Sequence, residues 1–159
     1  MKILYPDYKY ESIEKIEIDM LKEKGVKGVI LDIDNTLVEP HTPVADERTV
    51  KFVEFLKNEG FKVCIVSNNI YERAKKFADS IPVDFICDGN KPAKRPFYLA
   101  LGKLKLEPKD VAVVGDQIFT DILGANRWGF VSVLVKPVCD KEGWFVKFKR
   151  IFEKLIVKW

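Results

Sequence analysis

Short apolar runs alternate along this chain with longer stretches in which apolar residues recur at helical spacing. The apolar runs predict strands over residues 27–33, 61–66, 83–87, 111–114 and 131–135. The amphipathic stretches predict helices over residues 13–24, 46–59, 70–80, 96–106 and 118–127, and a last helix from about residue 143. Ser12 is a candidate cap for the first helix. Strands that alternate with helices of this length are typical of a three-layer, Rossmann-like α/β fold, in which helices cover both faces of a parallel sheet.

The stretch VILDIDNTLV, residues 29–38, carries the most informative polar residues. It predicts a buried strand that presents Asp32 and Asp34 at its end, where open α/β sheets bind ligands. Carboxylates one residue apart point to opposite faces of a regular strand, so both reach one site only if a loop begins at Asp34. Two acids at the end of a strand are also common as turn residues or as a helix cap.

Polar side chains follow the other predicted strands as well. Ser67 follows the second strand, Lys91 the third and Asp116 the fourth, with Asp121 five residues further on. Because the carboxyl ends of parallel strands lie at one edge of the sheet, we expect these residues to meet the two aspartates there. Carboxylates suit a hard cation such as Mg²⁺, which Mn²⁺ or Co²⁺ could replace, and a lysine and a hydroxyl suit phosphoryl oxygens. The chain has a single histidine, His41, which argues against a zinc site.

In order and position these residues resemble the haloacid dehalogenase superfamily of phosphohydrolases. DIDNTL is similar to the first motif of that family, Ser67 to its second, Lys91 with Pro92 to its third, and GDQIFTD, residues 115–121, to its fourth. The wider strings SNN, NKPAKRPF and GDQIFTDILGANRWGFVSVLV resemble the YqeG-type branch, which is similar to the phosphatases that remove the terminal phosphate of phosphatidylglycerophosphate. The resemblance implies a Mg²⁺-dependent phosphatase with a fold of the haloacid dehalogenase type.

The resemblance also implies a role for each motif residue. Asp32 would attack phosphorus and form an aspartyl phosphate, and Asp34 would first protonate the leaving oxygen and later activate water. Ser67 would hydrogen-bond the phosphoryl group, and Lys91 would neutralise charge on that group and on Asp32. The implied metal site consists of the side chains of Asp32 and Asp116 and the backbone carbonyl of Asp34, with Asp121 supporting the metal shell.

Three further residues, Asn68, Lys94 and Arg95, are candidates for substrate contacts. Lys94 is also an alternative to Lys91 as the third motif's lysine, but Lys91 is favoured because it directly follows the predicted strand loop and precedes Pro92. Lys94 and Arg95 would either rim the site and attract an anionic substrate or form the solvated start of a helix.

The spacing of the motifs limits what can cover the site. Only 32 residues separate Asp34 from Ser67, and 23 separate Ser67 from Lys91. Neither interval has room for a separate cap domain, so we expect an open site that admits a bulky or surface-bound substrate.

Length and composition are those of an ordinary globular protein. A chain of 159 residues, 47% hydrophobic and 32% charged, fits a single domain over residues 1–159. No apolar run approaches the roughly 18 residues that cross a bilayer, and the N-terminus lacks the apolar core of a signal peptide. We therefore expect a cytoplasmic protein, and we expect no nucleic-acid partner.

The C-terminal stretch GWFVKFKRIFEKLIVKW carries five basic residues and one acidic residue, in a chain whose net charge is +3. Its large apolar residues form one helical stripe: Trp144, Phe145, Phe148, Ile151, Phe152, Leu155, Ile156 and Trp159. The expected basic face consists of Lys147, Lys149, Arg150, Lys154 and Lys158. A basic amphipathic helix over about residues 143–158 either binds the surface of an anionic membrane or packs on the sheet or in a dimer.

These observations predict a Mg²⁺-dependent phosphomonoesterase that acts through an aspartyl phosphate on a phospholipid head group, with phosphatidylglycerophosphate as the leading substrate. The C-terminal helix would then make a peripheral contact at the inner face of the membrane. One alternative is a phosphatase for a soluble sugar phosphate, nucleotide or phosphoprotein. Another is a non-catalytic receiver-like or membrane-binding module. A receiver would need its phospho-acceptor aspartate after the third strand, so the Asp32 and Asp34 pair after the first strand argues against it.

Overall fold

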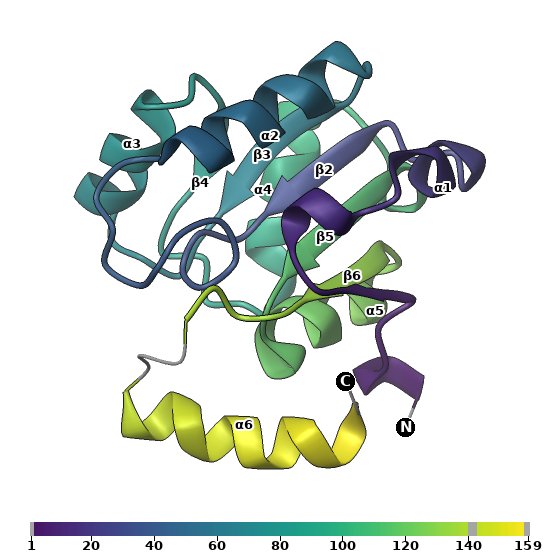
Figure 1. Cartoon of the computed structure of the whole chain (residues 1–159). Coiled ribbons are helices and arrows are strands. Elements are labelled where there is room, and N and C mark those ends of the chain that lie inside the picture. The colour runs from purple at the N-terminus through teal and green to yellow at the C-terminus, as the bar shows by residue number, and fades with distance from the viewer. Residues whose placement is uncertain (1, 140–142, 158–159) are drawn as a thin grey trace.

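The computed structural model describes residues 2–139 and 143–157, and its centre is a six-stranded sheet (Figure 1). The strands are β1 (Tyr8–Tyr10), β2 (Gly28–Leu31), β3 (Lys62–Val66), β4 (Asp84–Ile86), β5 (Val111–Gly115) and β6 (Val131–Val135). They lie in the order β1-β6-β5-β2-β3-β4, and every neighbouring pair runs parallel. The α/β, Rossmann-like fold predicted from the sequence is therefore confirmed.

Six α-helices are described around this sheet. They are α1 (Ile18–Glu23), α2 (Glu47–Asn58), α3 (Tyr71–Asp79), α4 (Lys94–Leu104), α5 (Leu123–Trp128) and α6 (Trp144–Ile156). Short 3₁₀ turns lie at Lys2–Leu4, Ile13–Lys15 and Pro108–Asp110, and a π-helical turn at Ile118–Ile122 leads into α5. In Figure 1, α2 and α3 lie at the top of the view and α6 lies at the bottom, on the side of β6.

Alternate residues of the central strands contribute to two hydrophobic cores, because successive side chains of a strand point to opposite faces. On one face Val29 of β2 belongs to the same core as Leu56 of α2. On the other face Ile30 belongs to the same core as Phe97 of α4. The sheet therefore has a helical layer on each side, which makes the three layers of the fold.

The strand order reverses direction between β2 and β5. From β2 the chain proceeds to β3 and β4 on one side, whereas β5 and β6 lie on the other side. At such a reversal the loops after the two strands diverge and open a crevice at the carboxyl ends of the strands. Asp32 follows β2 and Asp116 follows β5, so the topology places these two carboxylates on either side of that crevice.

Most of the predicted elements agree with the structure to within a few residues. The strand predicted over residues 131–135 is β6, and the helix predicted over residues 46–59 is α2, where the Asp46 side chain caps the helix by accepting a 2.8 Å hydrogen bond from the Thr49 amide. The helix predicted from about residue 143 is α6. Residues 32–46 and 67–70, which join β2 to α2 and β3 to α3, contain no additional domain.

Two predictions near the N-terminus were wrong. The helix predicted over residues 13–24 is two short pieces, a 3₁₀ turn and α1, because Glu17 between them has an extended backbone, with φ −77° and ψ 98°. Ser12 makes no capping hydrogen bond with its side chain. The strand β1 was not predicted, since three residues at the edge of a sheet are too few to display a period.

None of the described helices is both long and apolar enough to cross a membrane.

Candidate active site

The chain leaves strand geometry immediately after β2. The regular strand ends at Leu31, and the Asp32 amide adds one more bond to the sheet by donating to the Val114 carbonyl at 3.1 Å. Asn35 then adopts a positive φ of 61°, which turns the chain and frees Asp34 from the strand. Both aspartates line the same pocket as a result, which is the geometry that a loop beginning at Asp34 provides.

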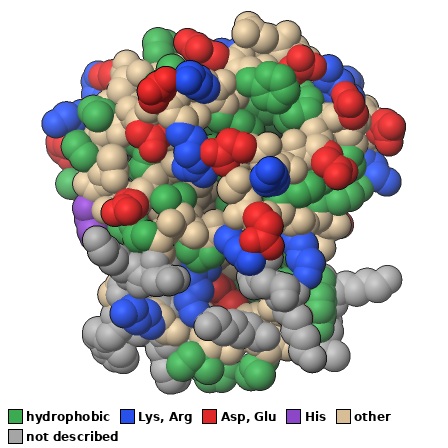
Figure 2. All heavy atoms as spheres, viewed as in Figure 1, with side chains coloured by type: hydrophobic (Ala, Val, Ile, Leu, Met, Phe, Trp, Pro, Cys, Tyr) green, Lys and Arg blue, Asp and Glu red, His purple; other side chains and the backbone are tan. Residues whose placement is uncertain are grey.

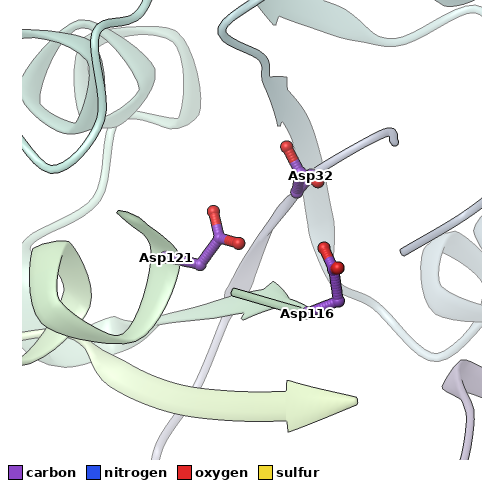
Figure 3. A group of neighbouring side chains, drawn as sticks. All are labelled: Asp32, Asp116 and Asp121. Atoms are coloured by element: carbon purple, nitrogen blue, oxygen red, sulfur yellow. The ribbon is translucent and has the colours of Figure 1, made fainter. Parts of the chain in front are cut away.

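Three buried carboxylates converge beside this pocket (Figure 3). Asp32 comes from the end of β2, Asp116 from the end of β5, and Asp121 from the π-helical turn that follows β5. Each offers an oxygen within 4.8 Å of the other two. Gly115 makes this approach possible, because a Cβ atom at that position would overlap the Asp121 carboxyl group. The Asp121 carboxylate also accepts a 3.2 Å hydrogen bond from the Gln117 amide, which fixes its direction.

Lys91 lies between two of these carboxylates. Its Nζ donates to Asp32 Oδ1 and to Asp121 Oδ1 at 2.6 Å each, and its side chain is only 3% exposed. Burial lowers the pKa of Lys91, but the carboxylates of Asp121 and Asp32 outweigh burial and raise the pKa above its usual range, so the ammonium stays charged. Burial raises the pKa of Asp32 to about 6, against the opposing effect of Lys91.

The loop after β3 contributes Ser67, Asn68 and Asn69 to the lining of the pocket. Ser67 Oγ accepts hydrogen bonds from the backbone amide and the Nδ2 of Asn69, at 3.1 and 2.8 Å. Asn68 Oδ1 accepts a 2.9 Å hydrogen bond from the Lys91 amide and so ties this loop to the loop after β4. The pocket has a volume of about 120 Å³, and Gln117 and Thr120 complete its lining.

Asp34 has a different set of neighbours. Arg73 donates to both carboxylate oxygens, through Nη1 to Oδ2 at 2.8 Å and through Nη2 to Oδ1 at 2.5 Å. Asn69 Nδ2 adds a 2.7 Å hydrogen bond and the His41 amide adds one of 3.2 Å. Burial alone would raise the pKa of Asp34, but the hydrogen bonds and the charge of Arg73 outweigh it and hold the pKa below its usual range.

Two of the candidate substrate residues do not reach the pocket. Lys94 and Arg95 are exposed at the start of α4, and neither lines the pocket. The Lys94 ammonium lies over the rings of Tyr98 and Trp128, at 4.3 and 5.5 Å from their centroids. The third candidate, Asn68, does line it. The sequence-predicted residues that the structure brings together are Asp32, Asp34, Ser67, Asn68, Lys91, Asp116 and Asp121.

Two residues of α6, Arg150 and Glu153, also lie at the acidic cluster. The position of Arg150 contradicts the expectation from the sequence that it belongs to the basic face of the helix. Its guanidinium donates to the Asp116 carboxylate and to the Asp116 backbone carbonyl. Glu153 is 7% exposed, and its Oε1 accepts a 2.8 Å hydrogen bond from the Ile118 amide. Arg150 therefore points toward the domain, whereas the periodicity of the tail placed it with the solvated lysines.

Part of the apolar stripe of α6 packs against the domain, and part of it is exposed to solvent. Ile156 is partly buried against a small cluster that contains Ile118, Leu134 and Val157, whereas other apolar residues of the helix are exposed: Ile151 at 60%, Phe152 at 47% and Leu155 at 77%. Figure 2 shows hydrophobic side chains on the outer edge of the molecule at the bottom of the view, where α6 lies in Figure 1. The side chains of Trp144, Phe145, Phe148, Lys149 and Lys154, and residues Lys158 and Trp159, lie outside the described part of the structure.

The charges of the buried cluster fit a divalent cation. Four carboxylates, those of Asp32, Asp116, Asp121 and Glu153, face the two cations of Lys91 and Arg150, which leaves two negative charges uncompensated. Burial and repulsion by Asp32 and Asp121 raise the pKa of Asp116 to about 8, although Arg150 opposes them. A cluster of carboxylate oxygens short of two positive charges suits a hard divalent cation, and Asp32, Asp116 and Asp121 are the residues that could hold it.

The chain matches two families of known proteins. Residues 44–129 match the haloacid dehalogenase-like hydrolases, and residues 1–84 match the mitochondrial PGP phosphatases. The chain is 40% identical over 156 residues to the probable phosphatase YqeG of Bacillus subtilis, an alignment that covers 98% of this chain and 91% of that protein. It is 27% identical over 169 residues to phosphatidylglycerophosphate phosphatase 1, chloroplastic/mitochondrial, of Arabidopsis thaliana, and covers 49% of that longer protein.

Solved structures share the fold. The cobalt-bound form of the deoxy-D-mannose-octulosonate 8-phosphate phosphatase of Haemophilus influenzae aligns with a TM-score of 0.58 at 12% identity, over 85% of this chain and 89% of that one. An uncharacterized protein from Listeria monocytogenes serotype 4b aligns with a TM-score of 0.59 at 25% identity, over 74% of this chain and 84% of that one. The first likeness, at its low identity, supports the fold alone.

Proposed function

Because this chain belongs to the haloacid dehalogenase-like hydrolases, we propose that it is a Mg²⁺-dependent phosphomonoesterase that acts through an aspartyl phosphate on the head group of phosphatidylglycerophosphate. The observation that carries the chemistry is the placement of Asp32. Its carboxylate is buried, is paired with the charged Lys91, and shares a small pocket with Asp34. A nucleophile, a cation and a proton carrier at one phosphate-sized pocket are the components of phosphoryl transfer through a covalent intermediate.

In the first proposed step an oxygen of Asp32 attacks the phosphorus, and the bond from phosphorus to the ester oxygen breaks. Lys91 keeps Asp32 ionised and neutralises negative charge on the transferring group, since its Nζ is 2.6 Å from Asp32 Oδ1. Mg²⁺ bound by the carboxylate cluster would supply the charge that offsets repulsion between the carboxylate and a phosphate dianion. With its Oγ already accepting two hydrogen bonds, Ser67 uses its hydroxyl proton to bind a phosphoryl oxygen.

Asp34 carries the proton in both steps of the proposed reaction. It protonates the leaving oxygen in the first step, and in the second it takes a proton from the water that attacks the aspartyl phosphate, which releases inorganic phosphate and regenerates Asp32. The low pKa that Arg73 imposes on Asp34 suits the second step. An incoming phosphate dianion raises that pKa by charge repulsion, which favours protonation of Asp34 before the first step.

A lipid substrate is supported by two features of the chain. One is the similarity to a protein named as a phosphatidylglycerophosphate phosphatase. The other is α6, whose residues Ile151, Phe152 and Leu155 are exposed and whose Lys147 is exposed as well. An apolar surface with basic neighbours is complementary to an anionic lipid surface, to which each basic residue contributes roughly 1 kcal/mol. We propose that this surface makes a peripheral contact with the membrane that holds the substrate.

The proposal is tested by Mg²⁺-dependent phosphate release from phosphatidylglycerophosphate in mixed micelles, measured beside a panel of soluble phosphate esters. We expect a strong preference for the lipid, and we expect Asp32→Asn to lower the rate by about 10⁴-fold or more, because it removes the nucleophile while keeping the size of the side chain. Leu155→Asp is the control for the surface of α6: it should weaken hydrolysis of the lipid and leave hydrolysis of soluble esters unchanged.

The results that would contradict the proposal differ for its two parts. Activity on soluble esters alone would retain the chemistry and overturn the lipid substrate. Full activity of Asp32→Asn on any ester would overturn the covalent mechanism, and the absence of phosphate release from every ester would favour a binding module.

A further inference from the structure

Helix α6 holds the segment that carries the candidate metal ligand Asp116. Arg150 donates to both the carboxylate and the backbone carbonyl of Asp116, and its Nη1 also donates to Glu153 Oε2 at 3.0 Å. The other oxygen of Glu153 accepts from the Ile118 amide. The side chains of Asp116, Glu153 and Arg150 are 0%, 8% and 15% exposed. Asp116 and the start of the π-helical turn therefore depend on α6 for several of their hydrogen bonds.

The two oxygens of the Asp116 carboxylate have different neighbours. Arg150 binds Oδ2, whereas Oδ1 accepts a 3.0 Å hydrogen bond from the hydroxyl of Thr36. The same hydroxyl lies 3.3 Å from Asp32 Oδ2, so it bridges the two carboxylates. The Asp116 oxygen on the side of Asp32 is therefore not the oxygen that Arg150 binds, so ligation of a cation by Asp116 would not require loss of the contact with Arg150.

We propose that Arg150 is a positioning residue for Asp116, so that docking of α6 and binding of the divalent cation stabilise each other. This inference rests on the proposed function only in taking Asp116 as a Mg²⁺ ligand. Residues that hold a metal ligand in place typically change metal affinity by about 10- to 100-fold when they are replaced. Since linkage between two equilibria is reciprocal, the cation must stabilise the docked helix by the same factor by which docking of the helix raises the affinity for the cation.

The direction in which the Mg²⁺ affinity changes when Arg150 is replaced distinguishes a positioning role from a purely electrostatic one. Removal of the Arg150 charge makes the cluster more negative, which by Coulomb's law alone would tighten binding of Mg²⁺. Loss of positioning would weaken it, because Asp116 loses the guanidinium that fixes its oxygens and the Ile118 segment loses part of its anchor. We expect the second effect to dominate, because the guanidinium contacts both the backbone and the side chain of Asp116.

The first test is calorimetric titration of the full chain with Mg²⁺. Arg150→Gln should weaken binding about 10-fold, and Arg150→Lys should recover part of the loss, since a lysine keeps the charge but not the forked geometry. Lys147→Gln is the matched control: it removes the same charge from an exposed position of the same helix and should leave the Mg²⁺ affinity unchanged. Equal or tighter binding by Arg150→Gln would overturn the inference.

The second test needs no substitution and so does not depend on the folding of a variant. Hydrogen exchange of the native chain should be slower in Mg²⁺ than without it for the amides of α6 and for the Val157 amide directly after the helix, which donates to the Glu153 carbonyl at 2.9 Å. Unchanged exchange of α6 at saturating Mg²⁺ would overturn the inference.

The two proposals fail in different measurements. Mg²⁺-dependent phosphate release together with undiminished Mg²⁺ binding by Arg150→Gln would retain the function and overturn the role of Arg150. Weaker binding by that variant in a chain that releases phosphate from no ester would support the linkage and contradict the function. If both hold, a single helix joins the surface proposed to meet the lipid to the site that hydrolyses it.

Discussion

Two carboxylates that lie one residue apart along the chain have opposite electrostatic environments. Asp32 belongs to a buried cluster in which negative charge exceeds positive charge, and its pKa is raised to about 6. Asp34 lies at the rim of the pocket, where Arg73 binds both of its oxygens and its pKa is lowered. In the proposed reaction the same residue type would therefore have two tasks, set by its neighbours: the buried cluster suits a nucleophile and a cation, and the rim suits proton transfer.

Among the substitutions that test the difference between Asp32 and Asp34, we expect the largest loss of rate from Asp34→Asn. The variant should retain metal binding and the attack by Asp32 but lose the proton carrier, which is typically worth about 10²- to 10⁴-fold in rate. The loss should be largest for alkyl phosphates, whose leaving oxygen needs a proton, and much smaller for p-nitrophenyl phosphate, whose leaving group does not. Comparison of kcat/KM for the two esters measures this, because kcat/KM depends on the first step and not on hydrolysis of the aspartyl phosphate, which both esters share. An equal loss of kcat/KM for both esters would contradict the role of Asp34 in protonating the leaving oxygen.

The second prediction concerns how the free energy of unfolding of the metal-free protein depends on pH. In the folded state the pKa values of Asp116 and Asp32, about 8 and about 6, exceed the ordinary value of 3.8. The folded state therefore binds more protons than the unfolded state in this window, and the free energy of unfolding should rise by on the order of a few kcal/mol as the pH falls from about 8 to about 5. The pair of Asp34 and Arg73 acts in the opposite direction, but only below about pH 4, where its depressed pKa is approached.

Denaturant unfolding at several pH values, in EDTA and in Mg²⁺, measures this effect. Bound Mg²⁺ should flatten the dependence above pH 5, because the cation takes the place of the bound protons. Asp116→Asn should flatten it in EDTA as well. A metal-free stability that falls on acidification from pH 8 would contradict the charge balance of the buried cluster.

The smallest effect is expected from Arg73→Gln, which leaves Asp34 in place but removes the guanidinium that orients it. We expect kcat/KM for alkyl phosphates to fall by about 10-fold, with little change of kcat/KM for p-nitrophenyl phosphate, whose leaving group needs no proton in the first step. Arg73→Lys should recover only part of the rate, since a lysine cannot bind both oxygens at once. If Arg73→Gln further impaired Asp34→Asn, then Arg73 would act on the substrate directly rather than through Asp34.

The site residues at the strand ends could be predicted from the sequence, because an apolar run followed by a polar residue can be recognised within a short stretch of the chain. Asp32, Ser67, Lys91 and Asp116 each follow such a run, and the parallel topology then fixes the edge of the sheet at which they gather. Asp34 could be included in the predicted site by a further argument. Side chains one residue apart in a strand point to opposite faces, so Asp34 reaches the same site as Asp32 only if the chain turns at that point.

Arg73 and Arg150 could not be predicted in the same way. Each lies on an amphipathic helix, and the direction of a charged side chain there depends on how the helix docks, which periodicity does not encode. Arg150 was assigned to the basic face because the helical periodicity of the tail placed it opposite the apolar stripe, together with the lysines. The one acidic residue of the tail, Glu153, was the available signal, since a lone carboxylate three residues from an arginine on a helix can mark a buried pair.

Lys94 and Arg95 are the opposite case: they were candidates for substrate contacts, but they do not line the pocket. Their position after the third motif suggested contact with substrate, but the first turn of α4 directs Lys94 over Tyr98 and Trp128 instead. Proximity along the chain therefore did not imply proximity in space.

The most direct test of the central claim, that Asp32 is the phosphoryl acceptor, is to trap the phosphorylated protein. The native chain is mixed with phosphatidylglycerophosphate and Mg²⁺, quenched in acid within the first turnover, digested and analysed by mass spectrometry. We predict an acid-stable, hydroxylamine-sensitive phosphoryl group on the peptide that contains Asp32, absent from Asp32→Asn and more abundant in Asp34→Asn, in which hydrolysis of the intermediate is slowed. Turnover without a phosphorylated Asp32 peptide in either the native chain or Asp34→Asn, or a phosphoryl group on another residue, would contradict the account.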